Sequence, residues 1–229
     1  MPVITISRMF GSGGSEVAAR VADGLGWTLL DNALVERVAA RLGRTPVEVQ
    51  AIEERVPSLA ERLADALALG STEIVSPSLS APLPPTEERL LEVTQHVIDD
   101  AIARGPVVLV GRGAQAYLAQ RADALHVFCY ASRPALIERV VQRDGVTAEE
   151  AAKRVDETNK RREQYVRRYW HRSWDAPENY HLCVNTEWLG IDGSGDLIVQ
   201  VENEPAGKVP DLGESHLCDG ALTDGDPEP

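Results

Sequence analysis

The sequence lacks any long hydrophobic run and contains few cysteines. Hydrophobic residues make up 43% and charged residues 26% of the 229 residues, a balance typical of a globular protein with one sizeable core. No apolar segment approaches the roughly 18–20 residues that span a bilayer, and residues 11–16 interrupt the N-terminus before it could form a secretory leader. No pair among Cys129, Cys183 and Cys218 has the spacing of metal ligands, so we expect reduced, structural thiols. These absences predict a cytoplasmic protein without membrane contact.

The chain also lacks an excess of basic residues. Its formal net charge is −13, which argues against a general nucleic-acid binder. Eight acidic residues and one lysine lie from Glu202 onward, so residues 204–229 are predicted to form an acidic, disordered tail. In contrast, eight basic and three acidic residues lie between Lys153 and Arg172. Such a basic segment suggests an anionic ligand, although i,i+4 pairs such as Glu157 with Arg161 would explain part of it as a solvated helix face.

The first 26 residues contain a β-branched run at 3–6, a glycine-rich turn at 7–15 and a helical pattern that ends at Gly26. Strand, glycine turn and helix in this order can cradle a phosphate, because backbone N–H groups and the helix dipole converge on the anion. An ordinary strand-to-helix turn is the alternative. We refer to residues 11–15 as the phosphate loop.

Two phosphate-binding motifs fit this loop imperfectly. The dinucleotide fingerprint places its third glycine at Glu16, where a large side chain spoils helix–strand packing. The mononucleotide P-loop fits better, with Gly13 as its second glycine and Ser15 as the Mg²⁺-binding hydroxyl. However, Arg8 stands at its first glycine and Gly14 at its lysine. The sequence therefore predicts a degenerate P-loop without the usual cation.

Apolar, strand-like runs alternate with helical patterns along the rest of the chain. The strands are predicted at 28–31, 107–110, 125–130 and 180–184, and helices at 32–42, 45–69 (in two stretches), 86–104, after Ser132, after Thr147 and from about Gly193. This alternation predicts an α/β fold with a parallel sheet covered by helices on both faces. Asp31 and Arg112 each follow a strand, so we expect both at the carboxyl edge, where open α/β sheets bind ligands. Asp31 could equally serve as a helix N-cap.

We expect one domain over residues 1–203, followed by the tail. Residues 44–103 are predicted to form a helical insertion on the substrate side, and residues 145–178 a basic, lid-like helical region. The Ser/Pro-rich segment 70–85 is long for a connection inside a compact domain.

Three groups of residues together resemble the cytidylate kinase-like family, which is related to the nucleoside monophosphate kinases. These are residues 4–8 with the glycines at 11, 13 and 14, residues 110–114, and residues 180–182 with 185–186. The resemblance covers about residues 3–203. It implies a three-layer P-loop NTPase fold with a five-stranded parallel sheet, ATP and Mg²⁺ as cofactors, and phosphoryl transfer to a nucleoside monophosphate such as CMP or to another small molecule.

The resemblance also implies roles for individual residues. Nucleotide binding would fall to Gly11, Ser12, Gly13, Gly14, Ser15 and Glu16. Ser15 would be the direct metal ligand, and Arg112 would grip the acceptor phosphate. Asp31 would either hold the metal through water or accept the proton of the acceptor. The lid arginines would be Arg161, Arg162 and Arg168. We hypothesise that Arg8 supplies the charge that Gly14 lacks, because preorganised arginines stabilise the transferring phosphoryl group.

The sequence departs from a cytidylate kinase at three positions. Gly14 replaces the P-loop lysine, Val110 replaces an aspartate before the glycine of the D-G-R-D motif, and Gly113 replaces the base-reading aspartate after its arginine. These losses favour a second interpretation, a non-catalytic nucleotide-binding protein that retains the kinase fold. Retention of Ser15 and Arg112 favours the kinase. A Rossmann-type oxidoreductase is disfavoured by the large residue at the third glycine.

Overall fold

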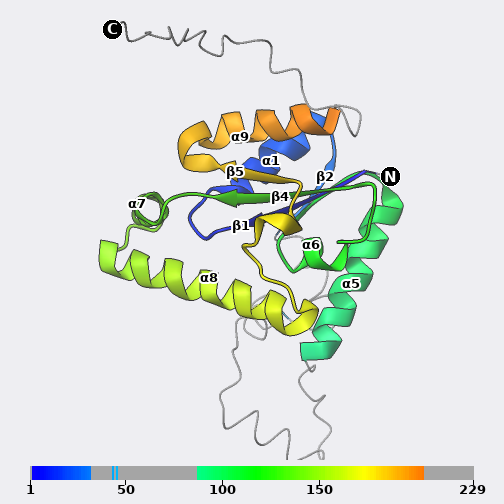
Figure 1. The fold of residues 1–229 in the computed structure, drawn as a ribbon, viewed down its shortest axis with the longest axis horizontal. Helices are drawn as coiled ribbons and strands as arrows, with labels where there is room; N and C mark the ends of the chain where they lie inside the picture. Colours follow the sequence, from blue (N-terminus) through cyan, green and yellow to red (C-terminus); the bar gives the residue numbers. More distant parts are fainter. Residues whose placement is uncertain (1, 32–42, 44, 46–86, 204–229) are drawn as a thin grey trace, which may run out of the picture.

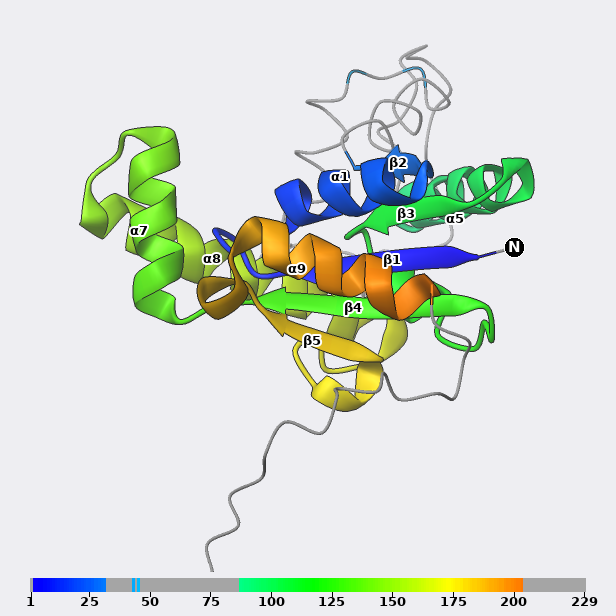
Figure 2. The same ribbon diagram turned by 90° about the horizontal axis from the view of Figure 1, so that it is seen from above.

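The structure, a computed structural model, describes residues 2–31, 43, 45 and 87–203. Its centre is a five-stranded sheet with the order β2-β3-β1-β4-β5 (Figure 2). The strands are β1 (Val3–Arg8), β2 (Thr28–Leu30), β3 (Val107–Val110), β4 (Ala124–Tyr130) and β5 (Leu182–Asn185). All four strand pairings are parallel, so the α/β prediction is confirmed.

Helices cover both faces of the sheet (Figure 1). One face carries α1 (Gly14–Leu25) and α9 (Thr186–Asn203), and the other carries α5 (Glu87–Arg104), α6 (Ala114–Tyr117) and α8 (Ala148–Trp170). The helix α7 (Arg133–Asp144) packs against α8, and a short 3₁₀ turn, η1 (Pro177–Asn179), precedes β5. The protein is thus a three-layer α/β domain.

The central strand, β1, fixes where the phosphate loop begins. Val3, Ile4 and Ile6 are fully buried, as expected for a strand with neighbours on both sides and helices on both faces. Ile4 and Ile6 pack with α1 and α9, whereas Val3 packs with α5. The loop that follows β1 therefore leaves the sheet at the middle of its carboxyl edge.

The predicted helix caps are present. The side chain of Ser132 accepts a hydrogen bond from the N–H of Ala135, with Pro134 in the first turn of α7. The Thr147 hydroxyl accepts from the N–H of Glu150 at 3.2 Å and begins α8. The last helix begins at Thr186, earlier than the predicted start near Gly193.

Two residues explain the earlier start of α9. The side-chain oxygen of Asn185 accepts from the N–H groups of Glu187 and Trp188, which caps a first turn that has no apolar periodicity. Gly190 then leaves the helical conformation, with φ 71° and ψ 177°. The apolar pattern visible in the sequence therefore marks only the part of α9 after this break.

The described part of the predicted insertion belongs to the core. Residues 87–103 lie in α5, whose buried Leu90, Val97 and Ile98 pack against side chains of the sheet. The rest of the insertion, the predicted helices at 32–42 and 45–69 and the acidic tail at 204–229 fall outside the described residues. Within the described ranges, no helix has both the length and the apolar character to cross a membrane.

A buried histidine, His126 on β4, makes stability dependent on pH. Its ring is 3% exposed, bonds through Nδ1 to the Thr5 hydroxyl at 2.7 Å, and stacks on His181 with 5.0 Å between ring centres. Burial, followed by the charges of His181 and Arg172, lowers the pKa of His126 from 6.5 to about 4. The unfolded chain therefore takes up a proton at a higher pH than the folded chain.

We expect acid to destabilise the fold through His126. Because its folded-state pKa lies below its unfolded value, the stabilisation is present above about pH 6.5 and is lost as the pH falls toward 4. The free energy of unfolding should fall by about 2 kcal/mol between pH 7 and pH 5. Denaturant unfolding at both pH values would measure this, with the exposed His96→Gln as the control. If His126→Gln loses as much stability between pH 7 and pH 5 as the wild type does, His126 is not the cause of the pH dependence.

Candidate active site

The phosphate loop presents backbone donors at the start of α1. Gly11 and Gly13 have positive φ, and Gly13 forms the N-cap of α1. The N–H of Ser12 donates to the Met9 carbonyl, but those of Gly11, Gly13 and Gly14 donate to no backbone acceptor within the described ranges. The Ser12 hydroxyl is fully buried and has no hydrogen-bond partner there either. Unused donors at a helix N-terminus suit an anion.

Two other elements hold the outer side of this loop. Arg139 of α7 donates through Nη1 to the Ser12 carbonyl at 3.0 Å, and the Thr186 hydroxyl donates to the same oxygen at 2.7 Å. Arg139 also binds the hydroxyl and carbonyl of Thr186, at 2.9 and 2.7 Å. The loop is therefore fixed between α7 and the β5–α9 junction.

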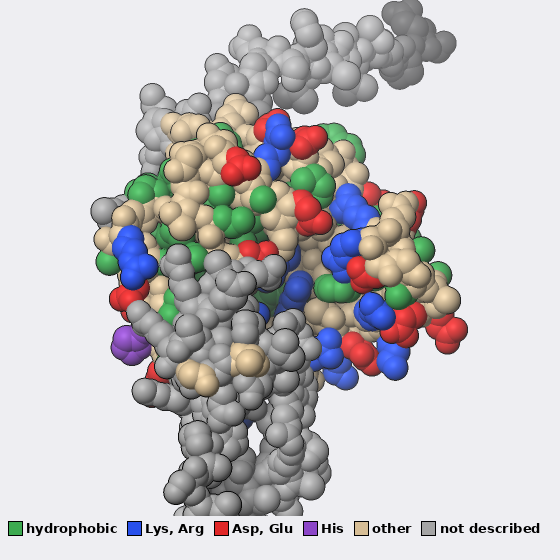
Figure 3. Space-filling model, turned by 180° about the vertical axis from the view of Figure 1, so that it is seen from behind, with side chains coloured by type: hydrophobic (Ala, Val, Ile, Leu, Met, Phe, Trp, Pro, Cys, Tyr) green, Lys and Arg blue, Asp and Glu red, His purple; other side chains and the backbone are tan. Residues whose placement is uncertain are grey.

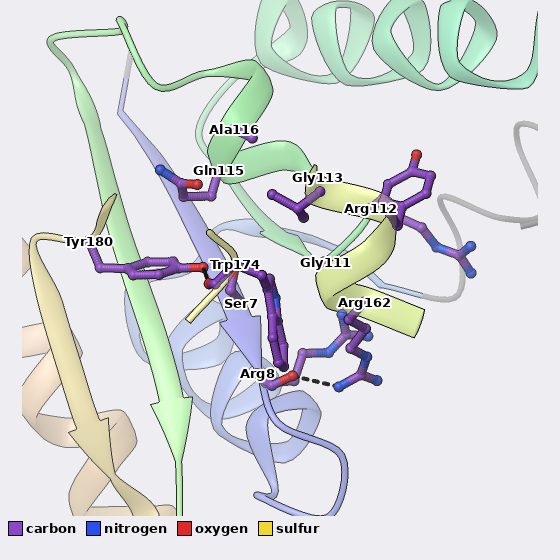
Figure 4. A pocket seen from close by; sticks show the side chains of 12 residues that line it. Ser7, Arg8, Gly111, Arg112, Gly113, Gln115, Ala116, Arg162, Trp174 and Tyr180 are labelled. Carbon is purple, nitrogen blue, oxygen red and sulfur yellow. Dashed lines mark hydrogen bonds between the residues drawn. The ribbon is translucent and has the colours of Figure 1, made fainter. Parts of the chain in front are cut away.

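Three arginines meet at the carboxyl edge of the sheet, beside the loop (Figure 4). Arg8 ends β1, Arg112 follows β3 and Arg162 lies on α8. They line a hollow that is partly open to solvent, which we call the arginine pocket. Asp31, which follows β2, lies at the same edge, with its Oδ1 3.6 Å from Arg8 Nη2. Asp31 and Arg112 therefore follow neighbouring parallel strands at the same edge of the sheet, as expected.

The electrostatics of these arginines are unusual. Burial and, second to it, the charge of Arg8 lower the pKa of the Arg162 guanidinium to about 9 and that of Arg112 to about 10. Burial also lowers the pKa of Arg8, while Asp31 opposes the shift. Cations held this close together and away from water are a good environment for a dianion such as phosphate.

The stem of Arg8 explains why the lysine position of the loop is a glycine. A Cβ on Gly14 would lie 2.4 Å from the Cβ and 2.9 Å from the Cγ of Arg8. The end of Arg8 lies against Gly111, where a Cβ would be 1.8 Å from Nη1. In the mononucleotide motif, positions 8 and 14 are glycine and lysine. The two departures from the motif therefore occupy positions that touch, and only one of them has room for a side chain.

The opposite wall of the arginine pocket is aromatic. Trp174 and Tyr180 line it, and the Tyr180 hydroxyl donates to the Trp174 carbonyl at 2.5 Å. Trp170 lies against Gly113, where a Cβ would be 2.2 Å from the indole. This contact and a φ of 67° require glycine at position 113, where a cytidylate kinase would have an aspartate by the resemblance described above. Arg112 itself has a φ of 56°, a conformation that non-glycine residues adopt rarely and mostly at functional sites.

The other predicted site residues are more dispersed. Arg161 donates to the Thr158 hydroxyl at 3.1 Å, and its charge contributes to the lowered pKa of Arg162. Arg168 is exposed and lies 5.5 Å from the Tyr169 ring, outside the pocket lining. Ser15 is half-buried and Glu16 exposed, both in the first turn of α1.

The basic segment on α8 is only partly directed at the site. Part of it is neutralised by acidic partners, such as Arg154 with Glu150 at 2.9 Å and Arg167 with Glu163 at 3.8 Å. Figure 3 shows Lys and Arg side chains alternating with Asp and Glu on this side of the molecule. Among the parts of the chain that the structure describes, no group of three or more His, Cys, Asp or Glu residues could hold a metal ion. A metal at this site would therefore depend on single protein ligands such as Ser15 and Asp31 together with the phosphates of a bound nucleotide.

Sequence reasoning missed three residues that hold the site. These are Arg139, the hydroxyl of Thr186, and Asn159, whose Oδ1 accepts from the N–H of Phe10 at 2.8 Å. Arg139 and Asn159 lie in helices far along the chain from the loop that they bind, and neither belongs to a motif. Thr186 was part of the resemblance, but its contact with the Ser12 carbonyl had no signal in the sequence.

Comparison with known proteins agrees with this architecture. A crystal structure of an uncharacterized protein from Eubacterium ventriosum has a TM-score of 0.65 and 19% identity, covering 90% of this chain and 100% of that one. TT1252 from Thermus thermophilus has a TM-score of 0.50 and 19% identity, covering 89% and 98%. Shikimate kinase from Acinetobacter baumannii, in complex with shikimate, has a TM-score of 0.49 and 17% identity, covering 88% and 92%.

No curated protein matches the chain. A model of the cytidylate kinase-like family matches residues 3–188, which span β1 to the start of α9 and include the phosphate loop and the arginine pocket. The protein therefore belongs to the cytidylate kinase-like family.

Proposed function

We propose that the protein is an ATP-dependent phosphotransferase whose acceptor carries an anionic group, such as the phosphate of CMP or of another small molecule. The observation that carries this proposal is the convergence of Arg8, Arg112 and Arg162 beside a glycine loop with unused N–H donors. A loop of this kind suits the phosphates of a nucleotide, and buried arginines suit the developing charge of phosphoryl transfer.

Each residue has a role that follows from its position. The N–H groups of the phosphate loop would hold the nucleotide phosphates, and the buried Ser12 hydroxyl provides a further partner. Ser15 and Asp31 would hold Mg²⁺. ATP supplies the transferable phosphoryl group. Arg112 would orient the acceptor, and Arg8 and Arg162 would stabilise charge on the equatorial oxygens.

A specific observation favours a second candidate, a nucleotide-binding protein without turnover. Asp31 lies 3.6 Å from Arg8, and both side chains are 19% exposed. An arginine engaged with a carboxylate in this way has a structural role, and the carboxylate is less available for a metal. The arginines that line the pocket oppose this interpretation, because a protein that only binds a nucleotide has little use for a clamp on the transition state.

Binding and turnover distinguish the two candidates. MgATP and MgADP would be titrated calorimetrically, and ADP release would then be measured with CMP, with other nucleoside monophosphates and with small phosphorylated molecules. We expect ADP release that depends on one class of acceptor. ATP binding without transfer to any acceptor would support the non-catalytic candidate, and absence of ATP binding would contradict both.

A further inference from the structure

The entry to the phosphate loop is held by a side chain from a distant helix. The ladder between β1 and β4 ends at Met9, whose N–H donates to the Cys129 carbonyl at 3.0 Å. The next N–H, that of Phe10, donates to Oδ1 of Asn159 on α8 at 2.8 Å. Phe10 is thus the first residue outside the sheet, and its amide is fixed by a helix 149 residues later in the chain.

The same helix binds the chain on the other side of Met9. Arg162 donates through Nη1 to the Arg8 carbonyl at 2.5 Å, the contact drawn as a dashed line in Figure 4. Residues three apart lie on one face of a helix, so Asn159 and Arg162 act together. Between them they bind the carbonyl of Arg8 and the amide of Phe10.

The side chain of Phe10 reinforces this arrangement. The guanidinium carbon of Arg143 lies 4.9 Å from its ring centre and that of Arg162 lies 6.0 Å away, both within cation–π range. Arg143 belongs to α7 and Arg162 to α8. The residue that leads into the loop is therefore anchored by both helices, through its ring as well as its amide.

Arg162 also lines the arginine pocket, so one guanidinium touches both sites. We propose that Asn159 is a positioning residue that, together with Arg162, couples an oxyanion in the arginine pocket to the nucleotide affinity of the phosphate loop. An anion bound to Arg162 restricts the motion of the guanidinium that also binds the Arg8 carbonyl. The hydrogen bond from the Phe10 N–H to Asn159 restricts the backbone on the other side of Met9, directly before the phosphate loop. The inference rests on the proposed function, because it requires a nucleotide at the loop.

The coupling is measurable as a change in ATP affinity. The dissociation constant of MgATP would be measured with and without inorganic phosphate in the wild type, in Asn159→Leu, which removes the acceptor, and in Asn159→Asp, which keeps an oxygen in its place. We expect phosphate to tighten ATP binding in the wild type. In Asn159→Leu we expect this tightening to vanish and ATP binding to weaken by about 3- to 10-fold, the worth of one hydrogen bond.

Controls separate positioning from stability. Asn159→Asp should restore most of the wild-type behaviour, and Lys160→Ala, at the exposed next position of α8, should match the wild type. Amide hydrogen exchange tests the contact in the unmodified protein, where the Phe10 N–H should be protected, and more so with phosphate.

The possible failures are distinguishable. Phosphate that competes only for the phosphate loop would weaken ATP binding in the wild type, which would overturn the coupling. Equal ATP affinity and equal phosphate response in a folded Asn159→Leu would overturn the role of Asn159. If Asn159→Leu does not fold, rapid exchange of the Phe10 amide in the wild type would overturn the role of Asn159. Absence of any ATP binding to the wild type would instead overturn the proposed function.

Discussion

Replacement of Arg8 by alanine is expected to slow phosphoryl transfer by about 30- to 1000-fold, which corresponds to about 2–4 kcal/mol of transition-state stabilisation. The reason is that the stem of Arg8 packs on Gly14, the loop position where the P-loop motif has lysine. Its guanidinium reaches Gly111 and Asp31, between the loop and the arginine pocket. Steady-state ADP release and calorimetric ATP binding would measure the effect.

The matched control is Arg154→Ala on α8, whose side chain makes an exposed pair with Glu150. We expect it to change turnover little, because exposed ion pairs contribute about 0–1 kcal/mol. Removal of Arg8 also leaves Asp31 without its cation, so Arg8→Ala/Asp31→Asn would be assayed beside the single variant. Unchanged turnover in a folded Arg8→Ala protein would rule out the compensation hypothesis and favour a structural pairing of Arg8 with Asp31.

Introducing the lysine of the P-loop motif at position 14 should destabilise the folded protein. Gly14→Lys is expected to reduce the free energy of unfolding by about 2–4 kcal/mol, through overpacking and through a second cation in a buried place. The physical cause is the 2.4 Å separation between a Cβ at position 14 and the Cβ of Arg8, at which both side chains cannot be present. Denaturant unfolding of the variant and the wild type would measure the loss.

The double variant Arg8→Gly/Gly14→Lys tests this explanation directly. It converts residues 8–15 into the ordinary motif, with glycine at position 8 and lysine at position 14. We expect it to recover at least about 1 kcal/mol relative to the sum of the two single variants, a coupling typical of residues in contact. It should also bind MgATP. If the losses in free energy of unfolding of the two single variants simply add up in the double variant, positions 8 and 14 are independent. The absence of lysine at position 14 then has another cause.

Local patterns in the sequence were sufficient for the framework of the fold. The buried run at 3–6 predicted β1, because a strand covered on both faces is apolar throughout. Ser132 and Thr147 marked the starts of α7 and α8, because a hydroxyl at the N-cap satisfies a free amide locally. The start of α9 was misjudged because its first turn is organised by Asn185 and broken at Gly190, without apolar periodicity.

The candidate site was predictable to the extent that topology fixed it. Arg8, Asp31 and Arg112 follow neighbouring parallel strands, so their meeting at one edge follows from the strand pattern alone. The sequence also identified the basic helix, but it could not select Arg162 over Arg161 or Arg168. Which arginine of α8 faces the pocket depends on how this helix packs, with Val155 against α7 and Val166 against Phe128 of β4.

By itself, then, the sequence determined the parallel α/β sheet, the glycine loop and the carboxyl edge at which charged residues gather, since each follows from short-range periodicity and strand direction. Only the tertiary structure decided that Arg8 excludes a side chain at Gly14, that Trp170 occupies the space beside Gly113, and that Asn159 and Arg139 hold the loop. These are contacts between residues far apart in the chain. Their geometry depends on how helices pack on the sheet, and no local pattern specifies it.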